Sequence, residues 1–228
     1  MPPELLIFDC DGVLVDSEPL AMRLLLETLA GEGVAIEADS AYRRFLGKDM
    51  AAIADAIGEE FGAGLSQPAL DAMHGRLYEL FRRELKPMPG IVAALEALRL
   101  PCCVASSSSA ERIRLALDVT GLRARFEPNI FSAAMVARGK PAPDLFLFAA
   151  GRMGVAPAAC VVIEDSPSGV EAAQRAGMAV FAFAGGAHAE REGHREALMA
   201  LKPLLIFDDM LKLPALLRRM APPRKGAQ

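Results

Sequence analysis

The fold class of this chain can be predicted from one stretch near its amino terminus, Leu5-Leu6-Ile7-Phe8-Asp9-Cys10-Asp11-Gly12-Val13-Leu14-Val15-Asp16. The first four residues form a continuous apolar run, which is typical of a strand buried on both faces of a parallel sheet. The run ends at Asp9, and Gly12 permits the backbone turn that leaves the sheet. Ligands bind outside the carboxyl ends of the strands in open α/β sheets, so Asp9 and Asp11 lie where a functional site is expected.

Asp9 and Asp11 are two residues apart, so both side chains can face the same cleft while Cys10 points the other way. Two carboxylates this close repel each other unless a cation or a shared proton relieves them. Two acids at the end of a strand can also be ordinary turn residues. A calcium-binding EF-hand loop is excluded, because Val13 would occupy a ligand position and Gly12 comes too early.

The composition indicates a globular protein, since 53% of the 228 residues are hydrophobic and the formal net charge is −4. A negative protein does not attract nucleic acid or an anionic membrane, so neither is expected as a partner. The amino terminus lacks the basic region of a signal peptide, and no apolar run is long enough to span a bilayer. We therefore expect a cytoplasmic protein with buried, reduced cysteines, namely Cys10, Cys102, Cys103 and Cys160.

The segment 18–85 has a helical pattern throughout. Apolar residues recur three to four positions apart in stretches around Leu24, Ile53 and Leu77, and no strand pattern interrupts them. The turn-rich sequence Lys86-Pro87-Met88-Pro89-Gly90 closes the segment. We predict that residues 18–85 form an α-helical cap domain, inserted into an α/β core made of residues 1–17 and 86–228.

From Gly90 onward helices and strands alternate, which predicts a Rossmann-like parallel sheet with helices on both faces. Strands are expected at residues 102–105, 130–132, 161–163, 179–183 and 204–207, and helices at 91–100 and near 143–154. Two further helices are predicted to begin at capping boxes, one made by Ser108 with Glu111 and one by Ser168 with Glu171.

Polar side chains follow three of the strands at their carboxyl ends: Asp9 with Asp11, Ser106, and Glu164 with Asp165. Lys140 adds a cation in a loop between the last two groups. Taken singly, Ser106 could be a turn residue, Lys140 a solvated charge, and the last two acids helix caps. The carboxyl ends of parallel strands lie at the same edge of a sheet, however, so together these residues indicate a reactive site.

Four motifs of this sequence resemble those of the haloacid dehalogenase superfamily, in the branch of sugar-phosphate phosphatases and β-phosphoglucomutase. They are Asp9-Cys10-Asp11-Gly12-Val13-Leu14-Val15-Asp16-Ser17-Glu18, the strand into Ser106, Lys140-Pro141-Ala142-Pro143-Asp144, and Ile163-Glu164-Asp165-Ser166-Pro167-Ser168-Gly169. Their order matches that of the family, and the resemblance covers nearly the whole chain. The helical insertion also matches the family's cap, which lies between the first and second motifs.

By this resemblance Asp9 would attack phosphorus and form an aspartyl-phosphate, and Asp11 would protonate the leaving alcohol and then deprotonate the attacking water. A carboxylate that attacks a phosphate dianion is repelled, so charge has to be neutralised first. Mg²⁺ fits that need, with ligands from the Asp9 side chain, the Asp11 backbone carbonyl and Asp165. Glu164 would be a ligand directly or through water.

The resemblance also implies which groups hold the phosphoryl oxygens. Lys140 and the Ser106 hydroxyl would contact them, and Lys140 would also hold the Asp9 carboxylate. The backbone N–H groups around Asp11 and Ser107 are further candidate donors. The expected function is therefore Mg²⁺-dependent hydrolysis of a small phosphate ester.

Membership of a superfamily does not settle the activity. Dehalogenases of this fold need no metal and lack the second acid of the first motif, whereas Asp11 is present here. A β-phosphoglucomutase has a cap histidine and a cap arginine where this sequence has Ala21 and Met50, which favours a phosphatase. A phospho-aspartate signalling receiver also groups acids, a hydroxyl and a lysine, but receivers are much shorter and have no use for a helical cap.

The cap is expected to select the substrate through Glu18, Arg43, Arg44 and Lys48, unless these residues form a solvated helix face. The basic residues suggest a leaving group with its own negative charge, because arginine can hold a carboxylate with two parallel hydrogen bonds. A phosphorylated sugar acid such as 6-phosphogluconate fits this hypothesis better than a neutral sugar phosphate. The histidines form no constellation and are expected at the surface: His74, His188 and His194. The sequence predicts no particular oligomeric state.

Overall fold

The computed structural model describes residues 2–45, 50–61, 66–190 and 193–220. Within these ranges the core is a sheet of six parallel strands in the order β3-β2-β1-β4-β5-β6. The strands are β1 (Leu5–Phe8), β2 (Cys102–Ser106), β3 (Ile130–Ser132), β4 (Cys160–Glu164), β5 (Ala179–Phe183) and β6 (Leu205–Phe207). The predicted α/β class is confirmed, and each predicted strand is displaced by no more than one residue at either end.

The strand β1 lies at the centre of the sheet because its side chains are apolar on both faces. It pairs with β2 through Ile7 and Cys103 and with β4 through Ile7 and Val162. Leu6 and Phe8 point into one hydrophobic cluster, whereas Leu5 and Ile7 point into the other. All four side chains are fully buried, because helices cover both faces of the sheet at this strand.

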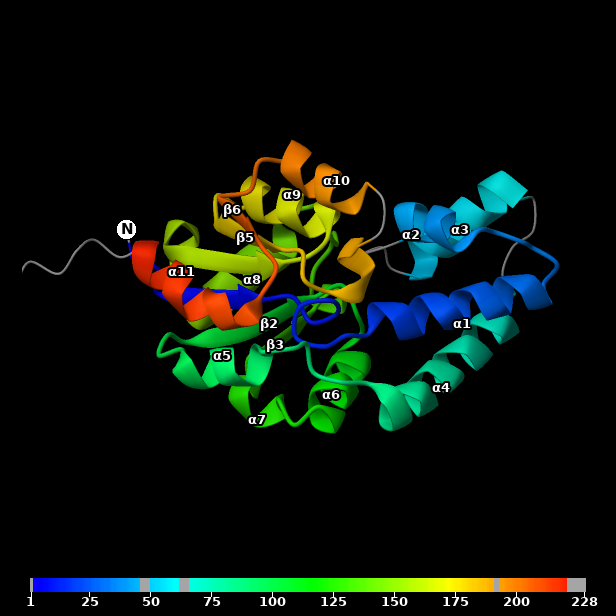
Figure 1. Cartoon of the computed structure of the whole chain (residues 1–228), viewed down its shortest axis with the longest axis horizontal. Helices are drawn as coiled ribbons and strands as arrows, with labels where there is room; N and C mark the ends of the chain where they lie inside the picture. Colours follow the sequence, from blue (N-terminus) through cyan, green and yellow to red (C-terminus); the bar gives the residue numbers. More distant parts are fainter. Residues whose placement is uncertain (1, 46–49, 62–65, 191–192, 221–228) are drawn as a thin grey trace, which may run out of the picture.

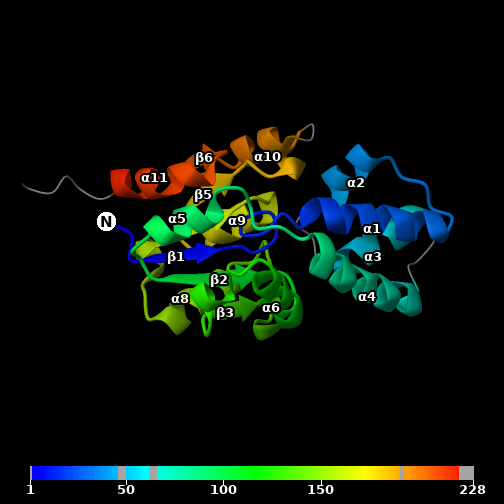
Figure 2. The same cartoon turned by 60° about the horizontal axis from the view of Figure 1, so that its bottom comes forward.

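Helices cover both faces of the sheet, and their layers can be followed in Figure 2. One face is covered by α5 (Ile91–Ala97), α6 (Ala110–Val119), α7 (Arg123–Phe126) and α11 (Leu213–Met220). The other is covered by α8 (Asp144–Met153), α9 (Pro167–Arg175) and α10 (His194–Ala200). Short 3-10 turns lie between these elements at η1 (Ala133–Met135), η2 (Pro157–Ala159), η3 (Ala187–Glu190) and η4 (Met210–Lys212). No helix in the described ranges is long and apolar enough to cross a membrane.

Helices also fill the segment that was predicted as the cap. Its described residues form α1 (Glu18–Gly31), α2 (Ala38–Phe45), α3 (Met50–Phe61) and α4 (Gln67–Glu84). Figure 1 shows them together on one side of the sheet, with α1 and α4 packed against each other. The helix α2 was not among the apolar stretches named from the sequence, and it buries one short face made of Ala41, Tyr42 and Phe45. That residues 18–85 are a separate domain stays a prediction.

The two connections between the sheet and these helices run side by side. Val15 and Pro87 form an antiparallel bridge. The Asp16 N–H donates to the Lys86 carbonyl at 3.0 Å, and the Met88 N–H donates to the Leu14 carbonyl at 2.9 Å. The chain therefore leaves the core and returns to it at one place.

The starts of two helices differ from the predicted capping boxes. The N-cap of α6 is Ser109 rather than Ser108, and that of α9 is Ser166 rather than Ser168. Neighbouring serines offer several candidate caps, and in both helices the one used has extended backbone and accepts a bond from the first helical turn. The helix predicted at 91–100 ends at Ala97, because the next residue already has extended backbone.

The contact between α7 and the central strand can be tested by mutation. Phe126 is fully buried and lies edge-to-face with Phe8, with ring centroids 5.9 Å apart. We expect Phe126→Ala to lower the free energy of unfolding by about 3–5 kcal/mol, because it leaves a cavity beside β1. Urea unfolding followed by circular dichroism measures this. The control is Leu147→Ala, whose side chain is 41% exposed, and which should cost less than about 1 kcal/mol. Equal stability of the two variants would show that α7 does not secure β1.

Candidate active site

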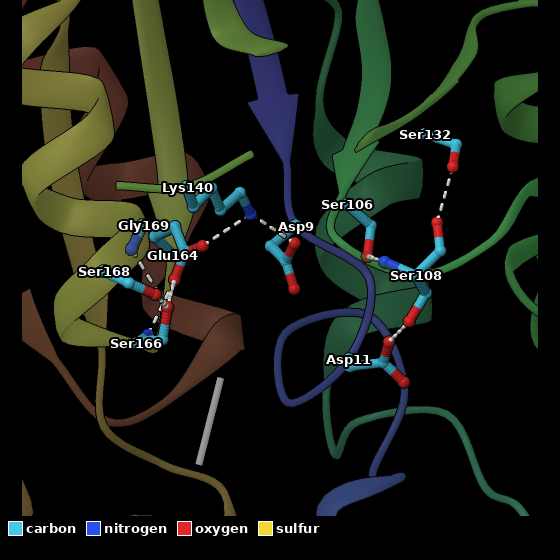
Figure 3. A network of polar contacts seen from close by, with 10 residues as sticks. All are labelled: Asp9, Asp11, Ser106, Ser108, Ser132, Lys140, Glu164, Ser166, Ser168 and Gly169. Carbon is cyan, nitrogen blue, oxygen red and sulfur yellow. Dashed lines mark hydrogen bonds and ion pairs between the residues drawn. The ribbon is translucent and has the colours of Figure 1, made fainter. Parts of the chain in front are cut away.

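The carboxyl ends of β1, β2 and β4 bring the predicted motif residues together, as Figure 3 shows. Asp9 directly follows β1, Ser106 ends β2 and Glu164 ends β4. The order of the strands reverses between β1 and β4. In open α/β sheets, ligands bind in the crevice at such a reversal. The sheet topology and the side chains thus point to the same place.

Lys140 lies between two acids at the centre of this site. Its Nζ donates to Asp9 Oδ1 at 2.6 Å and to Glu164 Oε1 at 2.7 Å, and its side chain is 2% exposed. The Phe146 ring lies 4.9 Å from Nζ. Burial lowers the pKa of Lys140, but Asp9 and Glu164 raise it by more, so the amine stays charged. The expected contact between Lys140 and Asp9 is present.

The loop that carries Lys140 is braced by ion pairs and hydrogen bonds. Arg138 holds both carboxylate oxygens of Asp144, at 3.2 and 3.0 Å. Arg175 of α9 donates to the Pro141 carbonyl at 3.1 Å. These contacts lie on either side of Lys140 in the chain and therefore fix the direction from which its side chain enters the site.

Asp9, Glu164 and Asp165 form a buried acidic cluster. One carboxylate oxygen of each lies within 4.8 Å of the others. Burial raises the pKa of Asp9 well above its usual range; Lys140 lowers it, while Glu164 and Asp165 raise it further. Burial and then Glu164 likewise raise the pKa of Asp165. One ammonium therefore does not offset three ionised carboxyl groups at this place, and a divalent metal ion with oxygen ligands would fit among them.

The start of α9 fixes the Glu164 side chain. Glu164 Oε2 accepts hydrogen bonds from the Ser166 backbone N–H at 2.6 Å and from the Ser166 hydroxyl at 2.9 Å. Gly169 faces the same carboxylate, and a Cβ at that position would overlap it. The motif therefore needs a glycine here for space.

Asp11 makes a separate set of contacts. Its Oδ1 accepts from the Ser17 hydroxyl at 2.5 Å and from Arg112 Nη2 at 2.8 Å, and its Oδ2 accepts from the Ser108 hydroxyl at 2.6 Å. Burial raises the pKa of Asp11, but Arg112 and the two hydroxyls together lower it by more, so the net pKa is below its usual value. Asp11 is therefore a carboxylate in this state, which suits a base.

The serines that follow β2 form a braced turn. Ser106 Oγ accepts the Ser108 N–H at 3.2 Å, and the Ser132 hydroxyl at the end of β3 donates to the Ser108 carbonyl at 2.7 Å. Figure 3 shows this chain of contacts beside Asp11. Ser106 and the predicted donor Ser107 both line the cavity described next.

A cavity of about 480 Å³ is lined by the motif residues and by residues of α1, α2, α3 and α4. Its volume suits a small metabolite. Glu18, one of the predicted substrate residues, lines it, as does Ala21. Met50 begins α3, and its side chain lies outside the described part of the structure.

The cap arginines are placed elsewhere. Among the described residues that line the cavity, neither Arg43 nor Arg44 is found. Arg43 is exposed, and Arg44 forms an ion pair with Glu60 of α3. Lys48 lies outside the described residues. The structure therefore does not bring these arginines to the site, and their substrate role stays a prediction without a contact.

Arg112 is a site residue that the sequence reasoning missed. It lies in α6 and lines the cavity together with His74 and Tyr78 of α4. The available signal was its position in the first turns of the helix that follows β2. Helices that follow parallel strands begin at the edge of the sheet where ligands bind.

His188 and His194 are buried, so the expectation that they lie at the surface is wrong. His188 is fully buried, and its Nε2 lies 2.8 Å from Asp165 Oδ2 without the alignment of a hydrogen bond. The two imidazole rings meet edge-to-face at 5.3 Å. Burial lowers the pKa of His188; burial and then His188 lower that of His194 to about 4. The loop after β5 reaches the same edge of the sheet, which was the signal for His188.

Several known proteins resemble this chain over most of its length. A family model described as haloacid dehalogenase-like hydrolase matches residues 3–177. A 6-phosphogluconate phosphatase of Escherichia coli is 30% identical over 81% of this chain and 84% of its own length. Hexitol phosphatase A of the same organism is 36% identical over 77% of this chain and 81% of its own. A haloacid dehalogenase-like protein of unknown function from Agrobacterium tumefaciens superimposes with a TM-score of 0.85 and 36% identity, covering 96% of this chain and all of that one.

The position of Glu18 predicts a pH-dependent stability. Burial, with Asp11 and Asp165 adding to it, raises the pKa of Glu18 to about 8, against 4.5 in an unfolded chain. Between these values the folded protein binds a proton that the unfolded chain has lost, so stability falls as the pH rises through this window. Glu18→Gln cannot ionise and should be more stable than wild type by about 1–3 kcal/mol near pH 8, with no difference below about pH 4.5.

Urea unfolding in a metal chelator measures this difference. Glu27→Gln in the same helix is the control, because that side chain is 50% exposed and pairs with Arg76. If the Glu18→Gln and wild-type stabilities run parallel from about pH 5 to 8, burial does not hold the Glu18 proton.

Proposed function

This chain belongs to the haloacid dehalogenase-like hydrolase family and is a phosphatase, and from that premise we propose that it hydrolyses a phosphorylated sugar or sugar acid with the help of Mg²⁺. The observation that carries the proposal is the buried contact of Lys140 with Asp9 and Glu164, at 2.6 and 2.7 Å, beside Asp165. It sets a carboxylate, a fixed cation and a metal-binding cluster around one crevice. Such a crevice suits an ester that carries a phosphate dianion.

Asp9 is the nucleophile in this proposal. Lys140 holds its Oδ1, and Figure 3 shows the second oxygen pointing away from Lys140. That oxygen forms a bond to phosphorus while the bond from phosphorus to the leaving alcohol breaks. Water then attacks the aspartyl-phosphate at phosphorus, which releases inorganic phosphate and returns the Asp9 carboxylate.

Asp9, Glu164 and Asp165, with the Asp11 backbone carbonyl, would hold the Mg²⁺. Their crowded negative charge and the raised pKa values of Asp9 and Asp165 are the reasons why these residues fit a divalent cation. When bound, the ion supplies positive charge that offsets the acids and the phosphate. Ser106, Lys140 and the N–H groups near Ser107 hold the phosphoryl oxygens.

Asp11 assists both half-reactions. As the carboxylate seen here it takes a proton from the attacking water. To protonate the leaving oxygen first, it has to bind a proton, and this requires its contacts with Arg112, Ser17 and Ser108 to loosen when the substrate binds. Ser108 lies in the connection between β2 and α6, and Arg112 lies in α6. A substrate that binds between these elements and the cap helices therefore changes the protonation state of Asp11.

The choice of a sugar phosphate or phosphorylated sugar acid is supported by the names of the related phosphatases, and 6-phosphogluconate is the first substrate to try. A phosphomutase needs a group that manages a second phosphate in the cap, and Ala21, which lines the cavity, has no such group. The buried free cysteines fit a reducing compartment, so we place the protein in the cytoplasm.

The first test concerns Asp9. Asp9→Asn keeps the shape of the side chain but removes the attacking charge, so phosphate release from 6-phosphogluconate and from p-nitrophenyl phosphate should fall to background. A chelator should do the same to the wild type, and Mg²⁺ should restore turnover. Asp118→Asn, an exposed aspartate paired with Arg123, is the control and should be unchanged. Substantial turnover by Asp9→Asn in a preparation free of deamidation would exclude the covalent mechanism.

The second test concerns Lys140. Lys140→Met should reduce turnover on the order of 10²-fold or more, because a preorganised donor on the developing anion is lost. Lys140→Arg should not restore it, since a planar guanidinium does not fit a site that is 2% exposed and packed on Phe146. Lys212→Met removes an exposed lysine and serves as the control. Near-normal turnover of Lys140→Arg would show that diffuse positive charge is sufficient.

A further inference from the structure

Arg112 is a cation of the cavity that, in the mechanism proposed above, acts only through its contact with Asp11 and is not assigned to the phosphoryl oxygens. Its side chain is 18% exposed and lines the cavity. Lys140, the cation of the third motif, is already held by Asp9 and Glu164. The side chains that line the cavity also include the acids Asp11 and Glu111, so a second anion on the substrate would need a positive partner here.

The contacts of Arg112 leave hydrogen-bond donors available. Nη2 donates to Asp11 Oδ1 at 2.8 Å, and the Phe81 ring of α4 lies 5.3 Å from Cζ. Nε is buried and has no hydrogen-bond partner among the described residues. A guanidinium has five N–H donors, and a buried donor without an acceptor costs free energy. Because the side chain lines the cavity, the guanidinium N–H groups that do not contact Asp11 can bind the two oxygens of a ligand carboxylate.

The position of Arg112 relates it to the leaving group. In the mechanism proposed above, Asp11 adjoins the oxygen of the leaving alcohol, and Arg112 is bound to Asp11. The leaving group therefore begins beside Arg112, in the cavity whose lining also includes His74 and Tyr78.

We propose that Arg112 determines the specificity of the enzyme by binding a carboxylate on the leaving group, so that a phosphorylated sugar acid is preferred to the corresponding sugar alcohol phosphate. The proposal rests on the proposed function and deepens it. Selection of the substrate is then made by the core helix α6. The sequence had suggested the cap residues Arg43, Arg44 and Lys48 for that role.

The test compares 6-phosphogluconate with sorbitol 6-phosphate, two open-chain esters that differ by a carboxylate against a hydroxymethyl group. The wild type should have the higher kcat/KM for the acid. Arg112→Met keeps an apolar stem on Phe81 and removes the guanidinium, so the ratio of the two kcat/KM values should fall about tenfold or more. Loss of the contact with Asp11 should slow the hydrolysis of both esters by the same factor, and that factor cancels in the ratio.

Two arginines serve as matched controls. Arg114 lies in the same helix and pairs with Glu127, and Arg44 pairs with Glu60 in the cap. Arg114→Met and Arg44→Met should leave the ratio unchanged within about twofold. Arg112→Lys keeps the charge but loses the planar fork and should lower the ratio several-fold; it carries the test if Arg112→Met does not fold.

Titration calorimetry of Asp9→Asn, which should not hydrolyse either ester, measures the same preference as the ratio of two dissociation constants. Arg112→Met in that background should bind the two esters with a ratio reduced by a similar factor. Equal losses for both esters would show that Arg112 only braces Asp11 and Phe81, and would overturn the proposal, as would a wild-type preference for sorbitol 6-phosphate. If the wild type releases no phosphate from either ester, the proposed function fails, and the binding ratio alone decides the role of Arg112.

Discussion

The rest of the site depends on the buried contact of one ammonium, that of Lys140, with Asp9 and Glu164. Buried charges are tolerated only when they are paired and hydrogen-bonded, so none of these groups can be placed without the others. They come from β1, from β4 and from the loop before α8. The Arg138–Asp144 pair fixes that loop, and Ser166 together with the space left by Gly169 fixes Glu164. The pairing of β1 with β4 thus brings Asp9 and Glu164 to the same ammonium.

Two carboxylates two residues apart have opposite electrostatic environments. Burial and neighbouring acids raise the pKa of Asp9, whereas Arg112 and two hydroxyls bring that of Asp11 below its usual value despite its burial. Pairs of acids with divergent pKa values are typical of sites that divide chemical roles between them. A cation among Asp9, Glu164 and Asp165 would lower the pKa of Asp9 by favouring its charged form.

Much of the fold and the motif part of the site could be predicted because the signals are local. The apolar runs of β1, β2 and β4 end at Asp9, Ser106 and Glu164, and parallel strands place such ends together. Side-chain placement in the tertiary structure could not be predicted. The Ser108 hydroxyl donates to Asp11 while Ser109 caps α6. His188 is buried against Asp165, although it follows two glycines in a loop. Likewise, the sequence shows that Arg44 is basic but not that it faces Glu60.

The adjacency of the two connections at Val15 and Pro87 has a consequence for how such a protein can change over evolutionary time. A segment whose two ends meet at one point can be lengthened, shortened or exchanged without separating the strands that precede and follow it. In this chain those strands are β1 and β2, which are neighbours in the sheet, and the reacting groups at their ends stay in register whatever lies between them. Leaving-group recognition that resides in α6 would be retained through such an exchange, whereas recognition that resides in the inserted helices would be replaced with them.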